Sequence, residues 1–166
     1  MNNPGTRWHA VMSLPILTDA QARAWQGFFG ALNGMEGSFK VPWPYSVPVM
    51  GAGAGAAAKV VGIHTQGKIL ASDGWPVSST VLLRGDVIRF GNLMRQVTQD
   101  VISDVGGVAS VYLSHEITES IANDTDINTT NSQVWGLFRL SNSNVPYDLN
   151  TITTSITAIA IEEVLP

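Results

Sequence analysis

The 166-residue sequence contains no cysteine, few charged residues and no basic cluster. Without cysteine it can form neither a disulfide bond nor a thiolate metal site. Charged residues make up 13% of the chain, against roughly 25% in a typical globular protein. Because the cores of protein interfaces are depleted in charge, this shortage favours a chain whose surface is partly covered by other subunits. A surface rich in Asn, Ser, Thr and Gln is the alternative explanation.

The formal net charge is −4, and the arginines closest to forming a patch are Arg84, Arg89 and Arg95. We expect these three at outward positions of neighbouring strands. Nucleic-acid binding needs a positive patch, so sequence-specific recognition of nucleic acid is disfavoured. The Met-Asn-Asn-Pro start has no basic region before an apolar stretch, so we expect no signal peptide.

The length predicts one domain, with an N-terminal strand and helix in residues 1–34, a loop in 42–58 and a β core in 59–164. Many short apolar runs separated by turn signals, together with one early helix, predict a mainly β fold. We expect an antiparallel β-sandwich or barrel with an appended N-terminal helix and a long Gly/Ala loop.

The helix is predicted at about residues 19–32. Thr18 and Gln21 have the spacing of a capping box, in which each side chain bonds to the other residue's backbone N–H. Asn33-Gly34 supplies a left-handed stop. Such an amphipathic face packs either on the helix's own sheet or on a neighbouring subunit. The expected packing face consists of Trp25, Phe28, Phe29 and Leu32.

The strongest β signal is a hairpin in which Gly91-Asn92 joins Val87–Phe90 to a strand over residues 93–97. Alternation over residues 108–113 places Ala109, Val111 and Leu113 on one face. Residues 123–133 are expected to form a polar loop. Further strands are expected near residues 8–12, 60–63, 80–83, 134–140 and within 152–164.

The segment Val41–Ala58 carries no charge, and its three prolines and alternating glycines break any membrane-spanning helix, so no membrane insertion is expected. It is predicted to be a long irregular loop. Because an uncharged, proline-rich segment is poorly explained as a free surface, we expect it to contact other subunits. The candidate contact residues are Trp43, Tyr45, Met50, Gly51, Gly53 and Gly55.

No catalytic, metal or cofactor motif is complete, so the chain is not expected to be an enzyme and no cofactor is expected. Asp124, Asp126 and Asn128 have the first spacings of a calcium loop, but Thr129 and Trp135 stand where that loop needs glycine and glutamate. The three histidines are far apart in the sequence. The adhesion-like tripeptide at residues 84–86 is explained by ordinary turn chemistry.

Several ordered segments resemble the distal tail proteins of long-tailed, siphovirus-like bacteriophages, over roughly residues 14–113. An apolar Leu-Pro-Ile-Leu run leads into the aromatic helix, and a Gly-Met-Glu-Gly-Ser-Phe segment follows the helix. The Gly/Ala loop, a Gly-Trp-Pro turn and a Leu-Arg-Gly-Asp turn come next, and two valine-containing segments complete the pattern. The segments carrying the resemblance are 14–17, 34–39, 51–58, 67–70, 74–76, 83–86, 96–101 and 103–109.

The resemblance implies a structural virion protein that forms a hexameric ring at the distal end of the tail tube. Its partners would be further copies of itself, the tail tube protein and the hub or tip proteins. The ring would be assembled in the bacterial cytoplasm and would leave a channel for DNA without reading its sequence.

Two alternatives remain open at this point. The chain could instead be a tail-tube or head–tail connector subunit, because other phage β modules share the Gly-Asp turn before a strand. It could also be a carbohydrate-binding β-sandwich module in which Trp43, Tyr45 or Trp75 stacks on sugar rings.

Overall fold

The computed structural model describes residues 7–142, 147–149, 154–156 and 159–164. The chain is mainly β with one α-helix in the described part, its strand pairs are antiparallel, and none of the described sheets closes into a barrel. The chain forms two compact units, which are described separately below. Unit 1 contains residues 41–136, and unit 2 joins Arg7–Lys40 to Leu137–Val164.

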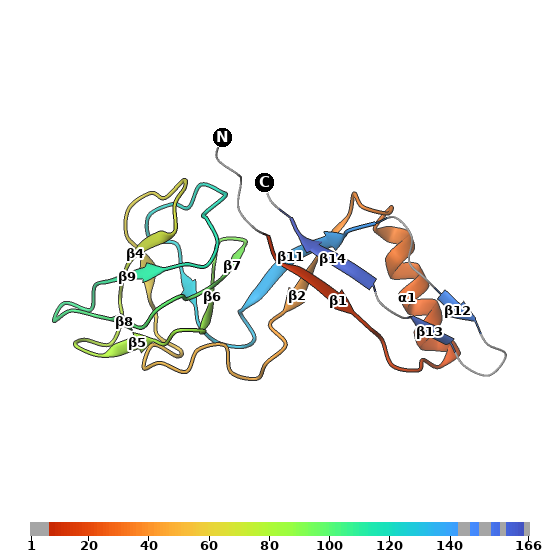
Figure 1. Cartoon of the computed structure of the whole chain (residues 1–166), viewed down its shortest axis with the longest axis horizontal. Coiled ribbons are helices and arrows are strands. Elements are labelled where there is room, and N and C mark those ends of the chain that lie inside the picture. Colours follow the sequence, from red (N-terminus) through yellow and green to blue (C-terminus); the bar gives the residue numbers. More distant parts are fainter. Residues whose placement is uncertain (1–6, 143–146, 150–153, 157–158, 165–166) are drawn as a thin grey trace. The chain divides into compact units, whose positions relative to one another are not determined.

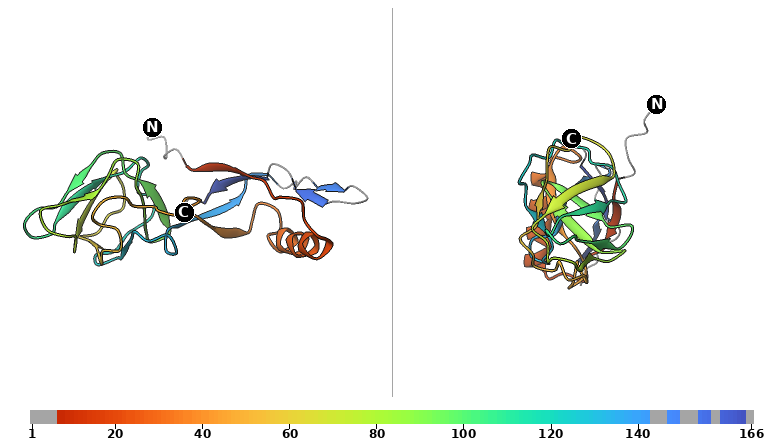
Figure 2. Two further views of the ribbon diagram at one scale, coloured as in Figure 1. Left: turned by 90° about the horizontal axis from the view of Figure 1, so that it is seen from below. Right: turned by 90° about the vertical axis from the view of Figure 1, so that its left-hand side faces the viewer.

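Unit 2 contains a four-stranded sheet with the strand order β1-β14-β11-β2. Figure 2 shows β1, in red, beside the dark-blue β14. A short strand pair, β12 with β13, completes the described elements. The bounds are β1 (His9–Met12), α1 (Asp19–Ala31), β2 (Ser38–Pro42), β11 (Trp135–Leu140), β12 (Tyr147–Leu149), β13 (Thr154–Ile156) and β14 (Ile159–Glu163).

The predicted helix and its caps are confirmed. The Thr18 hydroxyl accepts the Gln21 backbone N–H, and the Gln21 side chain accepts the Thr18 backbone N–H at 3.0 Å. After the helix, Asn33 and Gly34 both have positive φ, at 51° and 70°, and the Gly37 N–H closes the turn onto the Leu32 carbonyl at 2.8 Å. This geometry is the expected left-handed termination.

Unit 1 is built from three small antiparallel sheets, labelled in part in Figure 1. Their orders are β10-β6-β7, β3-β4-β9 and β5-β8. The bounds are β3 (Lys59–Val60), β4 (Ile69–Asp73), β5 (Thr80–Leu82), β6 (Val87–Phe90), β7 (Leu93–Gln96), β8 (Val101–Ile102), β9 (Ala109–Tyr112) and β10 (Ile127–Asn128).

The β6–β7 hairpin is confirmed, with Phe90 opposite Leu93 across a turn whose Gly91 has φ of 56°. The predicted alternation on β9 is also confirmed, because Ala109, Val111 and Leu113 are all buried. The strand expected over residues 60–63 is shorter, because Gly62 takes a positive φ of 80° and ends the pairing. The polar stretch 123–133 contains the short strand β10.

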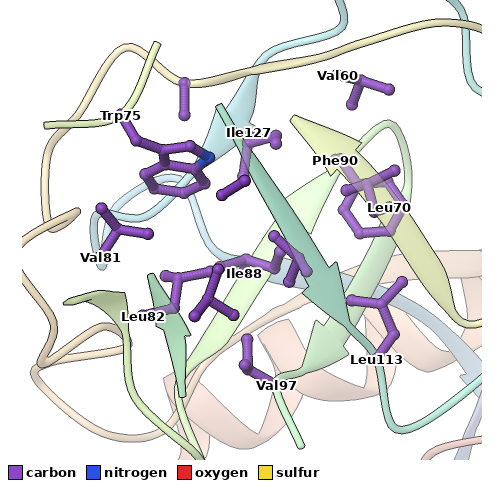
Figure 3. Close-up of a cluster of buried hydrophobic side chains, with 14 of the residues drawn as sticks. Val60, Leu70, Trp75, Val81, Leu82, Ile88, Phe90, Val97, Leu113 and Ile127 are labelled. Atoms are coloured by element: carbon purple, nitrogen blue, oxygen red, sulfur yellow. The ribbon is translucent and has the colours of Figure 1, made fainter. Parts of the chain in front are cut away.

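One continuous hydrophobic core fills unit 1. Every described strand of the unit contributes to it, and Figure 3 shows Trp75, Ile88 and Phe90 among its members. Its members are Val49, Ala58, Val60, Leu70, Trp75, Val81, Leu82, Ile88, Phe90, Leu93, Val97, Val101, Ala109, Val111, Leu113, Ile117, Ile121 and Ile127. All of them lie between residues 49 and 127, so a single stretch of chain supplies this core.

The division into units differs from the sequence prediction of one domain with a β core over residues 59–164. Residues 137–164 belong with the N-terminal helix and not with the preceding β segment. The reason is the pairing of β14, which lies between β1 from one end of the chain and β11 from the other. The predicted strand region 152–164 lies partly outside the described residues.

Candidate interaction surface

The uncharged segment after β2 is held to unit 1 by a buried carboxylate. Asp86 is only 4% exposed, and its oxygens accept the backbone N–H groups of Met50 at 3.0 Å, Gly51 at 3.3 Å and Leu83 at 2.8 Å. A buried charge is tolerated when several donors replace the lost water. Asp86 therefore fixes the segment, and the carboxylate of the adhesion-like tripeptide is not displayed to solvent.

The same segment runs alongside β5, as the orange trace in Figure 1 shows. The Ala52 N–H donates to the Thr80 carbonyl at 3.0 Å, and the Gly53 N–H donates to the Val81 carbonyl at 2.8 Å. These bonds resemble a continuation of the sheet, and they place the segment over the core. The segment is an integral part of unit 1.

Two of the six predicted contact residues have roles inside unit 1. A Cβ atom at Gly53 would lie 2.6 Å from the Trp75 ring, and one at Gly51 would overlap the Val81 carbonyl. Only glycine allows these close approaches. Alternating glycines gave the sequence signal for this segment, and the structure shows that at these two positions they serve internal packing.

The other four predicted contact residues reach the surface to different degrees. Tyr45 is 67% exposed and Met50 is 76% exposed, whereas Trp43 is half-buried. The Trp43 and Tyr45 rings meet edge-on, with centroids 5.3 Å apart. Gly55 is exposed, with φ of 75°, and donates its N–H to the Thr129 hydroxyl at 2.8 Å.

A second exposed apolar group lies on the outer side of the β3-β4-β9 sheet and was missed by the sequence analysis. Ile69 is 53% exposed and stands opposite Tyr112, which is 37% exposed. Val61 continues the group, because its N–H bonds to the Ala71 carbonyl on β4. The available signal was that these apolar residues alternate with the buried Leu70, so both faces of the strand are apolar.

A third exposed apolar group surrounds the turn after β8. Val105 is 87% exposed and Ile102 is 69% exposed. The neighbouring segment carries Val77, which is 58% exposed, and is joined to this turn by the bond from the Ser78 N–H to the Asp104 carbonyl at 3.0 Å. The turn itself is closed by the bond from the Gly107 N–H to the Asp104 carbonyl at 3.1 Å.

The predicted helix face packs within unit 2. Phe29 and Leu32 are buried, whereas Trp25 and Phe28 are half-buried. The three aromatic rings contact one another, and Phe28 also meets Phe39 of β2 edge-on at 5.4 Å. The aromatic side chains therefore join the helix to the sheet.

The expectation that three arginines point outward from neighbouring strands is wrong for Arg95. Its side chain is fully buried, and its guanidinium donates to the carbonyls of Glu116 at 3.2 Å and Met94 at 2.9 Å. Arg89 is half-buried with its guanidinium 4.3 Å from the Trp135 ring, and burial lowers the pKa of this arginine. These two arginines serve the fold, so no positive patch forms from the three.

The candidate sites for other chemistry are also explained by the fold. Trp75 is buried and donates its indole N–H to the Ser72 hydroxyl at 2.8 Å, so it is not placed to stack on a sugar. Asp126 forms an ion pair with Lys59 at 4.0 Å, and Asp124 occupies a turn with φ of 62°. Within the described part of the chain, no three His, Asp or Glu side chains gather to hold a metal ion.

No family model matches the chain, and no curated protein matches it. Among the described residues, no helix is both long enough and apolar enough to cross a membrane.

Proposed function

We propose that this chain is a structural subunit of a long-tailed phage tail, forming a ring at the distal end of the tail tube that joins the tube to the tip. The observation that carries the proposal is the surface of unit 1. Large apolar side chains are exposed on the 43–50 segment, on the outer side of β4 and β9, and around the turn after β8. Exposed apolar surface in a chain with little charge is typical of subunits that are covered in an assembly.

The roles of the tail-protein-like segments also support a structural function. The aspartate of the Leu-Arg-Gly-Asp segment anchors the loop, and the tryptophan of the Gly-Trp-Pro segment fills the core. The Asp104 side chain accepts the N–H groups of Gly106 at 2.8 Å and Val108 at 2.9 Å. The characteristic residues of these segments thus build a β-sandwich-like module with closely held turns.

In the proposed ring, each subunit presents one surface to its neighbour and a different surface to the next, so that the contacts close by rotation. The partners would be further copies of the chain in a hexamer, the tube protein on one side and the hub or tip proteins on the other. No catalytic step and no cofactor is part of this function.

The test is light scattering of the purified protein followed by negative-stain imaging of the same fraction. Closed rings with an open channel support the distal position, and continuous tubes would support the alternative of a tail-tube subunit. A protein that stays monomeric alone and also with the tube and hub proteins of its phage would contradict the proposal.

The carbohydrate-binding alternative now depends on Trp43 and Tyr45, because Trp75 is buried. These two rings meet at an interplanar angle of 67°, so they do not form the flat platform on which a sugar ring would stack. A glycan array with the wild-type protein and a Tyr45→Ala variant tests this alternative. Saturable binding that the variant loses would favour it over the assembly function.

A further inference from the structure

The strand β1 forms one edge of the four-stranded sheet in unit 2. It pairs with β14 on one side, and among the described residues no strand pairs with its other side. Its residues His9, Ala10 and Val11 are exposed, Val11 to 69%. Figure 2 shows β1 at this edge. An edge strand presents backbone donors and acceptors that another strand can use.

The hydrogen bonds of β14 show which of its residues bond to β1 and which bond to β11. The Glu163 N–H donates to the Trp8 carbonyl, at 2.8 Å, on the β1 side. On the β11 side, the Ser141 N–H donates to the Ala160 carbonyl at 3.0 Å. Successive residues of β14 therefore bond in turn to the β1 side and to the β11 side, as antiparallel geometry requires.

This alternation fixes the direction of the backbone groups in β1. His9 stands opposite Glu162 and Val11 opposite Ala160, which are the β14 residues that bond toward β11. The pairs His9–Glu162 and Val11–Ala160 are consequently non-hydrogen-bonded pairs. His9 and Val11 direct their N–H and C=O groups to the open side of β1, whereas Ala10 directs its groups to β14.

The two edges of this sheet differ in how they are protected. The other edge strand, β2, carries Lys40 and ends at Pro42, and both residue types discourage edge-to-edge pairing. The sequence of β1 is His-Ala-Val-Met, with neither lysine nor proline. The charges beside β1 are already paired, since Arg7 and Arg139 both contact Glu162, at 3.3 Å and 2.8 Å.

We propose that β1 pairs antiparallel with β1 of a second copy of this chain, about a two-fold axis that passes beside Ala10. His9 of one copy then forms a hydrogen-bonded pair with Val11 of the other, and the reverse pair forms by symmetry. The two four-stranded sheets become one continuous sheet across the axis. This contact is isologous, so it is distinct from the ring contacts proposed above and does not depend on them.

The choice of a second copy as the partner follows from the self-complementarity of the edge. His9 and Val11 supply the outward N–H and C=O groups. A two-fold rotation about an axis beside Ala10 brings His9 of one copy opposite Val11 of the other, so the donors of each strand face the acceptors of the other. Ala10 of each copy then meets the other across the axis in a non-hydrogen-bonded pair, where Cα atoms approach to about 4.5 Å. A small side chain stands at the point where the strands come closest, and no two like charges face each other.

Cysteine cross-linking tests the register directly, because the chain contains no cysteine of its own. An Ala10→Cys variant puts one thiol on each side of the axis, within the Cα separation of roughly 4.4–6.8 Å that a disulfide needs. Under mild oxidation we expect the full-length variant to form a disulfide-linked dimer.

Two single-cysteine controls measure the background. In the proposed register His9→Cys places its thiols two residues apart along the strands, and Ile63→Cys exposes a thiol in unit 1, where Ile63 is 73% exposed. We expect Ala10→Cys to cross-link at least tenfold faster than either control. Equal rates for the three variants, or no dimer from Ala10→Cys, would overturn the proposal.

A second experiment separates backbone pairing from side-chain contact. Val11→Pro in the Ala10→Cys background removes an N–H that points away from β14, so cross-linking should fall to the background rate while the circular dichroism spectrum stays unchanged. Val11→Thr in the same background keeps the N–H and should cross-link normally. Loss of cross-linking with Val11→Thr, or its retention with a folded Val11→Pro, contradicts backbone pairing.

A variant that leaves the backbone intact covers the case in which Val11→Pro does not fold. Ala10 is exposed, so Ala10→Lys is compatible with the single copy but brings two positive charges together at the axis. Sedimentation velocity of the wild-type chain should show a reversible self-association. The same measurement on the Ala10→Lys variant, without any cysteine substitution, should show none. Wild-type association that persists in Ala10→Lys would place the contact elsewhere.

Discussion

The two units of this protein differ in which parts of the chain build them. Unit 1 takes its whole core from one stretch of chain between residues 49 and 127. Unit 2 buries residues from both ends of the chain, with Phe29 and Leu32 on one side and Phe138 and Ile161 on the other. Its sheet therefore closes only when segments more than a hundred residues apart come together, which costs chain entropy before the contacts form.

The aromatic residues in the core of unit 1 are more deeply buried than Trp25 and Phe28 of unit 2. In unit 1, Phe90 is fully buried and Trp75 is 4% exposed, and the indole N–H of Trp75 has a buried partner. In unit 2, Trp25 and Phe28 remain half-buried at the helix–sheet contact. The helix of unit 2 therefore keeps part of its aromatic face at the surface, whereas the core aromatics of unit 1 are shielded from solvent.

The largest effects are expected from removing a buried ring in each unit, and they test whether the two units unfold separately. Phe90→Ala removes a buried ring from the core of unit 1 and should cost about 3–5 kcal/mol. Phe29→Ala makes the matched change in unit 2. Hydrogen exchange followed by mass spectrometry should show lost protection in residues 41–136 for the first variant and in residues 7–40 and 137–142 for the second. A uniform loss across both units in either variant would show that they unfold as one body.

The next effect concerns the carboxylate that holds the uncharged segment. Asp86→Ala leaves three backbone N–H groups without their acceptor and should lower the free energy of unfolding by about 3 kcal/mol, measured by urea denaturation. Asp100→Ala is the control, because Asp100 is exposed and, within the described part of the chain, accepts one hydrogen bond, from the Arg84 N–H. Similar losses in both variants would mean that burial of Asp86 adds nothing.

Replacing glycine by alanine should destabilise unit 1 at Gly53 and stabilise unit 2 at Gly27. Gly53→Ala in unit 1 places a methyl group against the Trp75 ring and should cost about 1–3 kcal/mol. Gly27→Ala lies in α1 of unit 2, where nothing is within 4 Å of the added carbon, and should stabilise by about 0.5–1 kcal/mol. Thermal melts followed by tryptophan fluorescence measure both. A neutral Gly53→Ala would show that the segment moves aside easily.

Local patterns in the sequence were sufficient to predict several elements. The capping box at Thr18, the stop at Asn33-Gly34 and the Gly91-Asn92 hairpin depend on residues within a few positions of one another, and all three are present. The alternation around Val111 gave the correct buried face because a strand has a fixed period of two. Each of these predictions needed no knowledge of distant partners.

Predictions that depended on distant partners were less successful. Arg95 was expected at an outward strand position, but its side chain is buried and donates hydrogen bonds to two backbone carbonyls in the interior. The segment around Gly53 was expected to contact other subunits because it is uncharged and rich in proline. Its attachment to unit 1 was not predicted, because its anchor, Asp86, lies more than thirty residues further along the chain. The division into units escaped prediction for the same reason, since β14 gives no sign of its pairing with β1.

The smallest expected effect tests whether the helix depends on its own caps or on the packing of unit 2. Thr18→Ala removes the acceptor for the Gln21 N–H and should cost about 1 kcal/mol, while Thr18→Ser keeps the hydroxyl and should change little. If packing against Phe39 alone maintained α1, both variants would show the same hydrogen exchange in residues 19–25. Faster exchange confined to that first turn in Thr18→Ala would show that the cap stabilises this end of the helix. The cap needs no distant partner, whereas the sheet of the same unit forms only when the two ends of the chain come together.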